Sequence, residues 1–192
     1  MIFIEARMWE SIQGGSVEKA VTIVFRRWDD RTADGLIRIP FYVTPDIEMS
    51  EKHMNSIIAG LGVLNAVSCV KFEPATPYDR NVIKIFKGVG CLASVGMQGD
   101  TQKMSLSDTC PGVGMVEHEA MHALGIWHEQ SRPDRDDYVK ILEENIIPGQ
   151  ETNFYKFSKD QVESFSSPYD FGSIMHYYST TFSKNGERTI ER

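Results

Sequence analysis

Three of the five histidines in this 192-residue chain lie within the stretch HEAMHALGIWH, at positions 118–128. His118 and His122 are four residues apart, so on a helix their side chains stack on one face, one turn from each other. His128 comes six residues after His122, and a continuing helix would carry it too far round to join them. Gly125 lies between them, and glycine tolerates the left-handed conformation that ends a helix. The stretch therefore predicts a helix that ends at Gly125 and a turn that brings His128 back.

This spacing is typical of a metal site. His118 and His122 can share one cation, and Glu119 can reach a metal-bound water as a general base without itself binding the metal. The pattern H-E-x-x-H alone also arises by chance, as the polar side of an ordinary helix. The glycine and the third histidine are independent additions that serve the same geometry, and they favour the metal site. Three neutral imidazoles would leave such a metal ion an open position, where a water molecule can bind.

The charge balance argues against nucleic-acid binding. The formal net charge is -7 and the pI is about 5.2, whereas a nucleic-acid footprint needs a surplus of Lys and Arg on one face. No stretch approaches the roughly 18 to 20 continuous apolar residues that cross a bilayer. Neither a nucleic-acid partner nor a membrane span is expected.

The length suits one domain with a core, or two small lobes that share a cleft.

Local patterns predict strands and helices up to the motif and little regular structure after it. A helix that Ser50 can cap is expected at 51–67, with His53 as a solvated residue, and a second helix from about Pro111 to Leu124. A further helix is expected at 137–146, and 166–187 is expected to be turn and loop. Strands are expected at 36–45, 69–74, 81–88 and twice within 90–108.

The three cysteines, Cys69, Cys91 and Cys110, make an odd count. One disulfide with one remaining thiol would suit an oxidising compartment. Three reduced, buried thiols in a cytosolic protein are about as compatible with the count, because free cysteine is commonly buried.

Two stretches carry a family resemblance. HEAMHALGIWHEQSRPDRDDYV (118–139) fits H-E-x-x-H-x-x-G-x-x-H-E-x-x-R-x-D-R-D, the signature of the astacin family of metzincin zinc endopeptidases. YDFGSIMHYYSTTFSKNG (169–186) resembles the Met-turn of that family, at the distance the family uses. Shorter matches in family order are IPFYV (39–43), SCVKF (68–72), GCLASVG (90–96) and NF (153–154). The resemblance extends from about Trp28 to the last residue.

The resemblance implies an α+β fold of the metzincin zinc-protease type. Two lobes would flank an active-site cleft, with a mixed sheet and two long helices in the N-terminal lobe and a mostly irregular C-terminal lobe. Residues 28–192 would be the catalytic domain, without its C-terminal end. Residues 1–27 would be an N-terminal segment, the propeptide remnant of a zymogen.

The resemblance also assigns roles to residues. His118, His122 and His128 would bind one Zn²⁺ per chain, and Glu119 would be the catalytic base. Tyr177 would be a further ligand that swings away when substrate binds and stabilises the oxyanion. Met175 would form a hydrophobic base under the site, since a thioether suits zinc poorly beside imidazole. His176 is not expected to be a ligand.

Residues after the third histidine would support the site. The resemblance implies that Glu129 contacts the buried amino terminus of the mature enzyme. Without the resemblance, Glu129 would be interpreted as a solvated charge. Arg132, Asp134, Arg135 and Asp136 are expected to form a salt-bridged turn that fixes the segment after His128.

The chain departs from the family pattern in its cysteines. The family has two disulfides, and Cys91 and Cys110 fit the shorter one. Cys69 fits the first half of the longer one, whose second cysteine normally lies near the C-terminal end of the domain. No cysteine follows Cys110, so Cys69 is expected to be unpaired. The resemblance and the expected disulfide together predict a secreted, extracellular protein.

The predicted function is that of a zinc-dependent endopeptidase, acting on a protein or extended peptide substrate. The alternative is a catalytically silent or truncated metzincin-fold binding module. A silent relative would be expected to lack Glu119 or a histidine, and this sequence keeps all of them.

Overall fold

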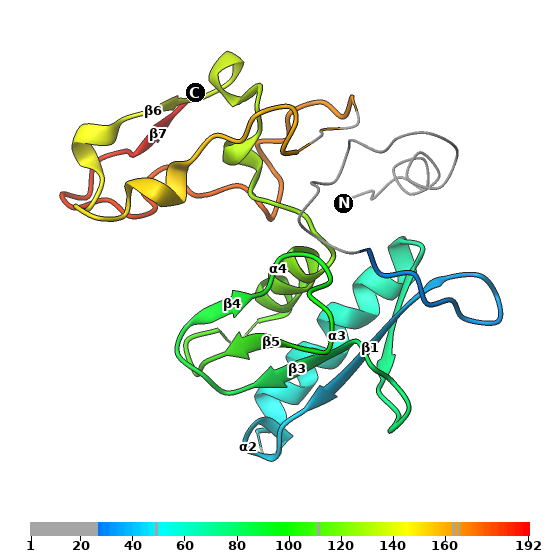
Figure 1. Ribbon diagram of the computed structural model, residues 1–192. Helices are drawn as coiled ribbons and strands as arrows, with labels where there is room; N and C mark the ends of the chain where they lie inside the picture. Colours follow the sequence, from blue (N-terminus) through cyan, green and yellow to red (C-terminus); the bar gives the residue numbers. More distant parts are fainter. Residues whose placement is uncertain (1–26, 49, 111, 163, 165) are drawn as a thin grey trace. The chain divides into compact units, whose positions relative to one another are not determined.

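The structure is a computed structural model that describes residues 27–48, 50–110, 112–162, 164 and 166–192 (Figure 1). The described residues form two compact units, which divide between Ile126 and Trp127. We call residues 27–126 the first unit and residues 127–192 the second unit. The two units correspond to the two predicted lobes. The N-terminal segment predicted to be a propeptide remnant lies, apart from Arg27, outside the described residues.

The first unit is built on a five-stranded sheet with the order β2-β1-β3-β5-β4 (Figure 1). The strands are β1 (Ile37–Val43), β2 (Val70–Pro74), β3 (Val82–Phe86), β4 (Cys91–Ala93) and β5 (Thr101–Leu106). β1 pairs in parallel with β2 and β3, and β3 pairs in parallel with β5. β4 pairs antiparallel with β5 and, among the described strands, lies at the edge of the sheet. The predicted mixed sheet is confirmed.

Three helices accompany this sheet: α2 (Pro45–Glu48), α3 (Glu51–Val67) and α4 (Val113–Ala123). α4 begins slightly later than predicted, and Pro111 lies outside the described residues. α3 packs against α4, and Gly60 permits the close approach, because a Cβ there would lie 2.9 Å from the Cβ of Val116. The core of the first unit lies between the sheet and these helices, and its most buried side chains include Ile37, Ile39, Ile57, Ile83, Ile85, Met104, Leu106 and Val116.

The prediction that His53 is solvated is wrong. Its side chain is only 6% exposed, because residue 53 lies on the face of α3 that continues into the buried Ile57 and Gly60. The Nδ1 atom of His53 is 2.8 Å from Ser50 Oγ, and its Nε2 atom is 3.1 Å from the carbonyl oxygen of Ser107. Ser50 precedes α3 as predicted, but its hydroxyl contacts this ring and makes no cap hydrogen bond.

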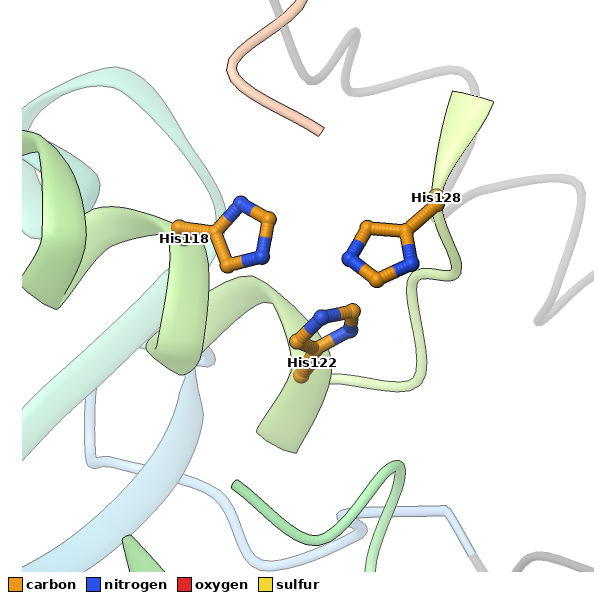
Figure 2. Close-up of side chains that lie close together, drawn as sticks. All are labelled: His118, His122 and His128. Atoms are coloured by element: carbon orange, nitrogen blue, oxygen red, sulfur yellow. The ribbon is translucent and has the colours of Figure 1, made fainter. Parts of the chain in front are cut away.

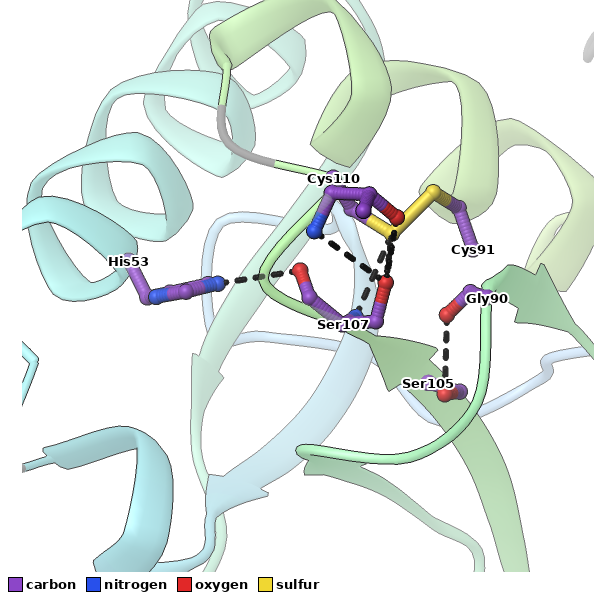
Figure 3. Close-up of a disulfide and its surroundings, with 7 residues drawn as sticks. His53, Gly90, Cys91, Ser105, Ser107 and Cys110 are labelled. Carbon is purple, nitrogen blue, oxygen red and sulfur yellow. Dashed lines mark hydrogen bonds between the residues drawn. A yellow bond between two sulfur atoms is a disulfide. The ribbon is translucent and has the colours of Figure 1, made fainter.

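Cys91 and Cys110 form the predicted disulfide, with an S–S distance of 2.05 Å. Figure 3 shows His53 and the disulfide on either side of Ser107, whose backbone N–H donates to Cys110 Sγ at 3.2 Å. The loop between β5 and α4 is thus tied both to β4 and to α3. Cys69 carries a free thiol, as predicted, and partial burial raises the pKa of that thiol.

The second unit has little regular structure, as predicted. Its strands are β6 (Lys140–Ile141) and β7 (Ile190–Glu191), which pair antiparallel. Its 3₁₀ helices are η1 (Glu129–Ser131), η2 (Arg135–Asp137), η3 (Glu143–Asn145) and η4 (Glu151–Phe154). A buried cluster holds these short elements together; it consists of Val139, Ile146, Phe154, Tyr169 and Ile190.

The helix predicted at 137–146 is wrong. This segment forms β6 and η3 instead. Its backbone bonds to residues much later in the chain: Ile141 pairs with Ile190, and the N–H of Leu142 donates to the carbonyl of Thr189 at 2.9 Å. Pairing with a distant strand has overridden the local helical preference.

Within the described part of the chain, no helix has the length and apolar character needed to span a membrane.

Candidate active site

α4 carries the first two histidines of the motif on one face. The ring centroids of His118 and His122 are 4.7 Å apart, with the ring planes at 86°. Figure 2 shows both rings extending from α4 toward the ring of His128, which comes from the segment after the helix. One potential ligand atom from each histidine lies within 4.8 Å of the other two. The structure therefore brings together the three residues that the motif predicted.

Gly125 ends α4 in the way the sequence predicted. Its φ is +99°, and its N–H donates to the carbonyl of His122 at 2.8 Å. The N–H of Ile126 donates to the carbonyl of Met121 at 3.0 Å. This pair of bonds is a Schellman motif, in which a left-handed residue closes the helix and turns the chain away. That turn is what allows His128 to approach His122.

We expect Gly125→Ala to lower the free energy of unfolding by about 1–2 kcal/mol, because an L residue in the left-handed region carries that cost. A Cβ at Gly125 would meet only the Cα of Gly96, at an ordinary 3.7 Å, so the effect should be conformational. Gly62→Ala in α3 is the matched control. A Cβ there meets nothing within 4 Å, and alanine should stabilise the helix by about 0.5–1 kcal/mol. If chemical denaturation showed the same change in the free energy of unfolding for both substitutions, this account of Gly125 would be contradicted.

His122 is held in its neutral form. It is 7% exposed, and its Nδ1 lies 2.8 Å from the carbonyl oxygen of Ile126. A carbonyl can only accept, so the proton sits on Nδ1 and the lone pair sits on Nε2. Burial, followed by the neighbouring His118, lowers the pKa of His122 to about 4. The ring is therefore unprotonated at neutral pH, the form that binds metal.

Glu119 lies within the same helix but is buried at 2% exposure. Burial raises the pKa of its carboxyl to about 7. Its Oε2 atom accepts no hydrogen bond from any described residue. The three imidazoles are a donor set that fits zinc. Glu119 follows His118 in the same helix and is not needed as a ligand, so it stays available as a base.

Met175 is buried, and His176 is hydrogen bonded on both sides of its ring. Met175 is 1% exposed, and its carbonyl accepts from the N–H of Glu129 at 2.9 Å. Both ring nitrogens of His176 have partners, the hydroxyl of Tyr169 at 2.8 Å and the carbonyl of Tyr177 at 2.7 Å. His176 is accordingly engaged in holding the Met-turn.

Tyr177 lies beside the third histidine. The ring centroids of His128 and Tyr177 are 4.5 Å apart, and Tyr177 also packs against Phe154 and Phe182. Burial raises the pKa of its phenol to about 12. At neutral pH the hydroxyl therefore keeps its proton and can donate it in a hydrogen bond.

Glu129 is a partnered carboxylate and not a solvated charge. Its Oε1 accepts from Arg132 Nη1 at 2.8 Å and from the N–H of Asp170 at 2.9 Å. Arg132 in turn donates to both carboxylate oxygens of Asp134, at 2.9 Å each. These bonds connect the segment after His128 to the beginning of the Met-turn region. The contact of Glu129 with a mature amino terminus stays a prediction.

The salt-bridged turn predicted after His128 is confirmed. Besides the pairs made by Arg132, Arg135 pairs with Asp136 at 3.1 Å.

Sequence reasoning missed Gln130, which is fully buried and accepts from the N–H of Tyr177 at 3.0 Å. Its position next to the motif was the only available signal. The sequence patterns also gave no role to Trp28. Its side chain is buried, and its Nε1 donates to the carbonyl of Ala123, the last residue of α4.

Comparison with known proteins agrees with this geometry. Zinc metalloproteinase nas-13 of Caenorhabditis elegans is 37% identical over 177 residues, which make up 92% of this chain and 38% of that protein. Meprin A subunit beta of Homo sapiens is 40% identical over 153 residues, or 79% of this chain and 21% of that protein. The chain thus spans less than two fifths of the length of these relatives.

A solved structure supports the same relationship. High choriolytic enzyme 1, a hatching enzyme zinc-protease from Oryzias latipes (medaka fish), matches with a TM-score of 0.78 at 34% identity. The match covers 85% of this chain and 80% of that chain, and it confirms the predicted metzincin-type α+β fold. The family model named Astacin, which describes a peptidase family, matches residues 25–192. This chain therefore belongs to the astacin family of peptidases.

Proposed function

We propose that this chain is a zinc-dependent endopeptidase that hydrolyses internal bonds of an extended peptide. The observation that carries the proposal is the convergence of three imidazoles, together with a buried glutamate in the helix that carries two of them; one oxygen of this glutamate has no partner among the described residues. An ordinary helix has no physical reason to combine these features, because burying an unpaired carboxyl is costly.

His118, His122 and His128 would hold one Zn²⁺. When bound, the ion supplies a Lewis acid that acidifies a water molecule and polarises the carbonyl of the scissile bond. The hydrogen bond from His122 Nδ1 to the carbonyl of Ile126 supports this role, since such bonds orient a ligand ring and fix its tautomer.

Glu119 would act as general base and then as general acid. Its carboxylate would accept a proton from the attacking water and pass that proton to the amine that leaves when the C–N bond breaks. Burial supports this role, because it removes the carboxyl from bulk water and raises its pKa above the ordinary value, which makes the group a stronger base.

Tyr177 would stabilise charge on the substrate. As the carbonyl oxygen becomes negative, the protonated phenol of Tyr177 would donate a hydrogen bond to it. The position of Tyr177 beside the ring of His128 supports this role. The substrate backbone would pair with an edge strand of the first unit, and β4 is a candidate for that strand.

We also propose that the protein acts in an extracellular setting. The Cys91–Cys110 disulfide supports this, because disulfides persist in oxidising compartments.

The test is to incubate the chain with quenched fluorescent peptides whose two termini are chemically blocked. Blocked termini exclude exopeptidases, so release of fluorescence reports internal cleavage, and mass spectrometry locates the bond. We expect cleavage that stops with a zinc chelator. A chain that binds zinc but leaves every blocked peptide intact would contradict the proposal and favour the binding-module alternative.

A further inference from the structure

The backbone of Tyr177 is held by one buried side chain. The N–H of Tyr177 donates to Gln130 Oε1 at 3.0 Å, and Gln130 is 0% exposed. Gln130 lies two residues after His128, within η1. Its own backbone carbonyl accepts from Arg135 Nη1 at 3.0 Å, so Gln130 is fixed at both its backbone and its side chain.

This bond belongs to a series of contacts between residues 128–130 and 175–177. The rings of His128 and Tyr177 lie side by side, the N–H of Glu129 donates to the carbonyl of Met175, and Gln130 accepts from Tyr177. All of these contacts are made inside the second unit. The third histidine and the Met-turn tyrosine are therefore placed relative to each other by two hydrogen bonds from the residues that directly follow the histidine.

The orientation of the Gln130 amide is determined by its partner. The N–H of Tyr177 is a donor, so the oxygen and not the nitrogen of the amide must face it. The Nε2 atom of Gln130 is buried and has no partner among the described residues. An apolar side chain would fill the same space without that orphan donor, but it would leave the N–H of Tyr177 without its acceptor, so the bond to Tyr177 is what requires a glutamine here.

We propose that Gln130 is a positioning residue. It holds Tyr177 where the phenol hydroxyl can donate a hydrogen bond to the developing oxyanion of the substrate. The inference rests on the proposed function, and it assigns Gln130 no contact with the substrate. Its effect on the reaction passes entirely through Tyr177. The ring of Tyr177 is also packed by Phe154 and Phe182, so losing the Gln130 bond should misplace the tyrosine without unfolding the second unit.

The test is a double-mutant cycle with the variants Gln130→Met, Tyr177→Phe and the combination of the two. Methionine has a similar shape and removes both the acceptor and the orphan donor. Gln150→Met is the matched control, because Gln150 lies in the same unit and its side chain contacts Asn153. For each protein, kcat and KM on one blocked peptide, zinc content and thermal melting are measured.

We expect Gln130→Met to lower kcat by about 10-fold, since small misplacements of reacting groups are costly. KM should stay within about twofold, because the lost contact acts in the transition state. Zinc content should match that of Gln150→Met. Tm should fall, because the N–H of Tyr177 loses its acceptor, but the variant should stay folded at the assay temperature. In the Tyr177→Phe background, the Gln130 substitution should cost less than about twofold, because the two residues act as one unit.

The outcomes separate this inference from the proposed function. A wild type that cleaves nothing contradicts the proposed function itself. If wild type is active but Tyr177→Phe has full activity, there is no oxyanion role for Gln130 to serve and the inference is overturned. It is equally overturned if Gln130→Met costs the same factor in both backgrounds, or if its loss of activity only follows a loss of zinc or of folded protein.

Discussion

Glu119→Gln is expected to lower kcat for peptide cleavage by about 10²- to 10⁴-fold, the range that general acid–base catalysis contributes. Glutamine keeps the shape of the side chain but cannot take a proton from water. Zinc content should be unchanged, because none of the three histidines is altered. The variant should also melt no lower than wild type, since the buried carboxyl carries a desolvation cost that an amide avoids.

Glu117→Gln is the control for this variant. Glu117 belongs to the same helix, two residues earlier, and is only partly buried. The substitution makes the same chemical change, from carboxyl to amide. Activity should stay within about twofold of wild type, because substitutions of partly exposed side chains usually have small effects. Similar losses in the two variants, or full activity in Glu119→Gln with zinc bound, would show that Glu119 is not the base.

His128→Ala is expected to abolish stable zinc binding and, with it, peptide cleavage. Only two of the three imidazole ligands would remain, too few for a zinc site. In wild type, zinc at a free concentration about 1,000-fold above its Kd should stabilise the folded chain by about 4 kcal/mol. In His128→Ala this difference between zinc-loaded and zinc-stripped protein should vanish from the denaturation curves.

His176→Ala tests the specificity of that result. His176 belongs to the same unit, and both of its ring nitrogens are hydrogen bonded to residues other than the three histidines. This variant should retain one zinc per chain by elemental analysis. If His176→Ala loses zinc while His128→Ala retains it, the ligand set is wrongly assigned.

The parts of this molecule that follow from local rules were predictable. The helical spacing of His118 and His122 and the left-handed glycine at 125 both depend on residues close together in the chain. They were sufficient to predict the convergence of the three histidines. The first strands were predictable for a similar reason, because their apolar patterns are short and regular.

The parts that depend on distant partners were not predictable. His53 is buried because the loop carrying Ser107 lies against α3, a contact between residues 54 positions apart. Lys140 and Ile141 form a strand and not a helix because they pair with β7, at the other end of the second unit. Gln130 went unnoticed because its importance comes from the N–H of Tyr177, which lies 47 residues later. Sequence periodicity carries no information about such pairings.

The most direct test of the central claim is a zinc titration of the metal-stripped chain, with cleavage of a blocked peptide measured at each point. If the three histidines form the catalytic centre, activity should be absent without metal, rise in proportion to added zinc, and level off at one zinc per chain. Full cleavage by the stripped chain would contradict the account. So would a chain that takes up one zinc and gains no activity.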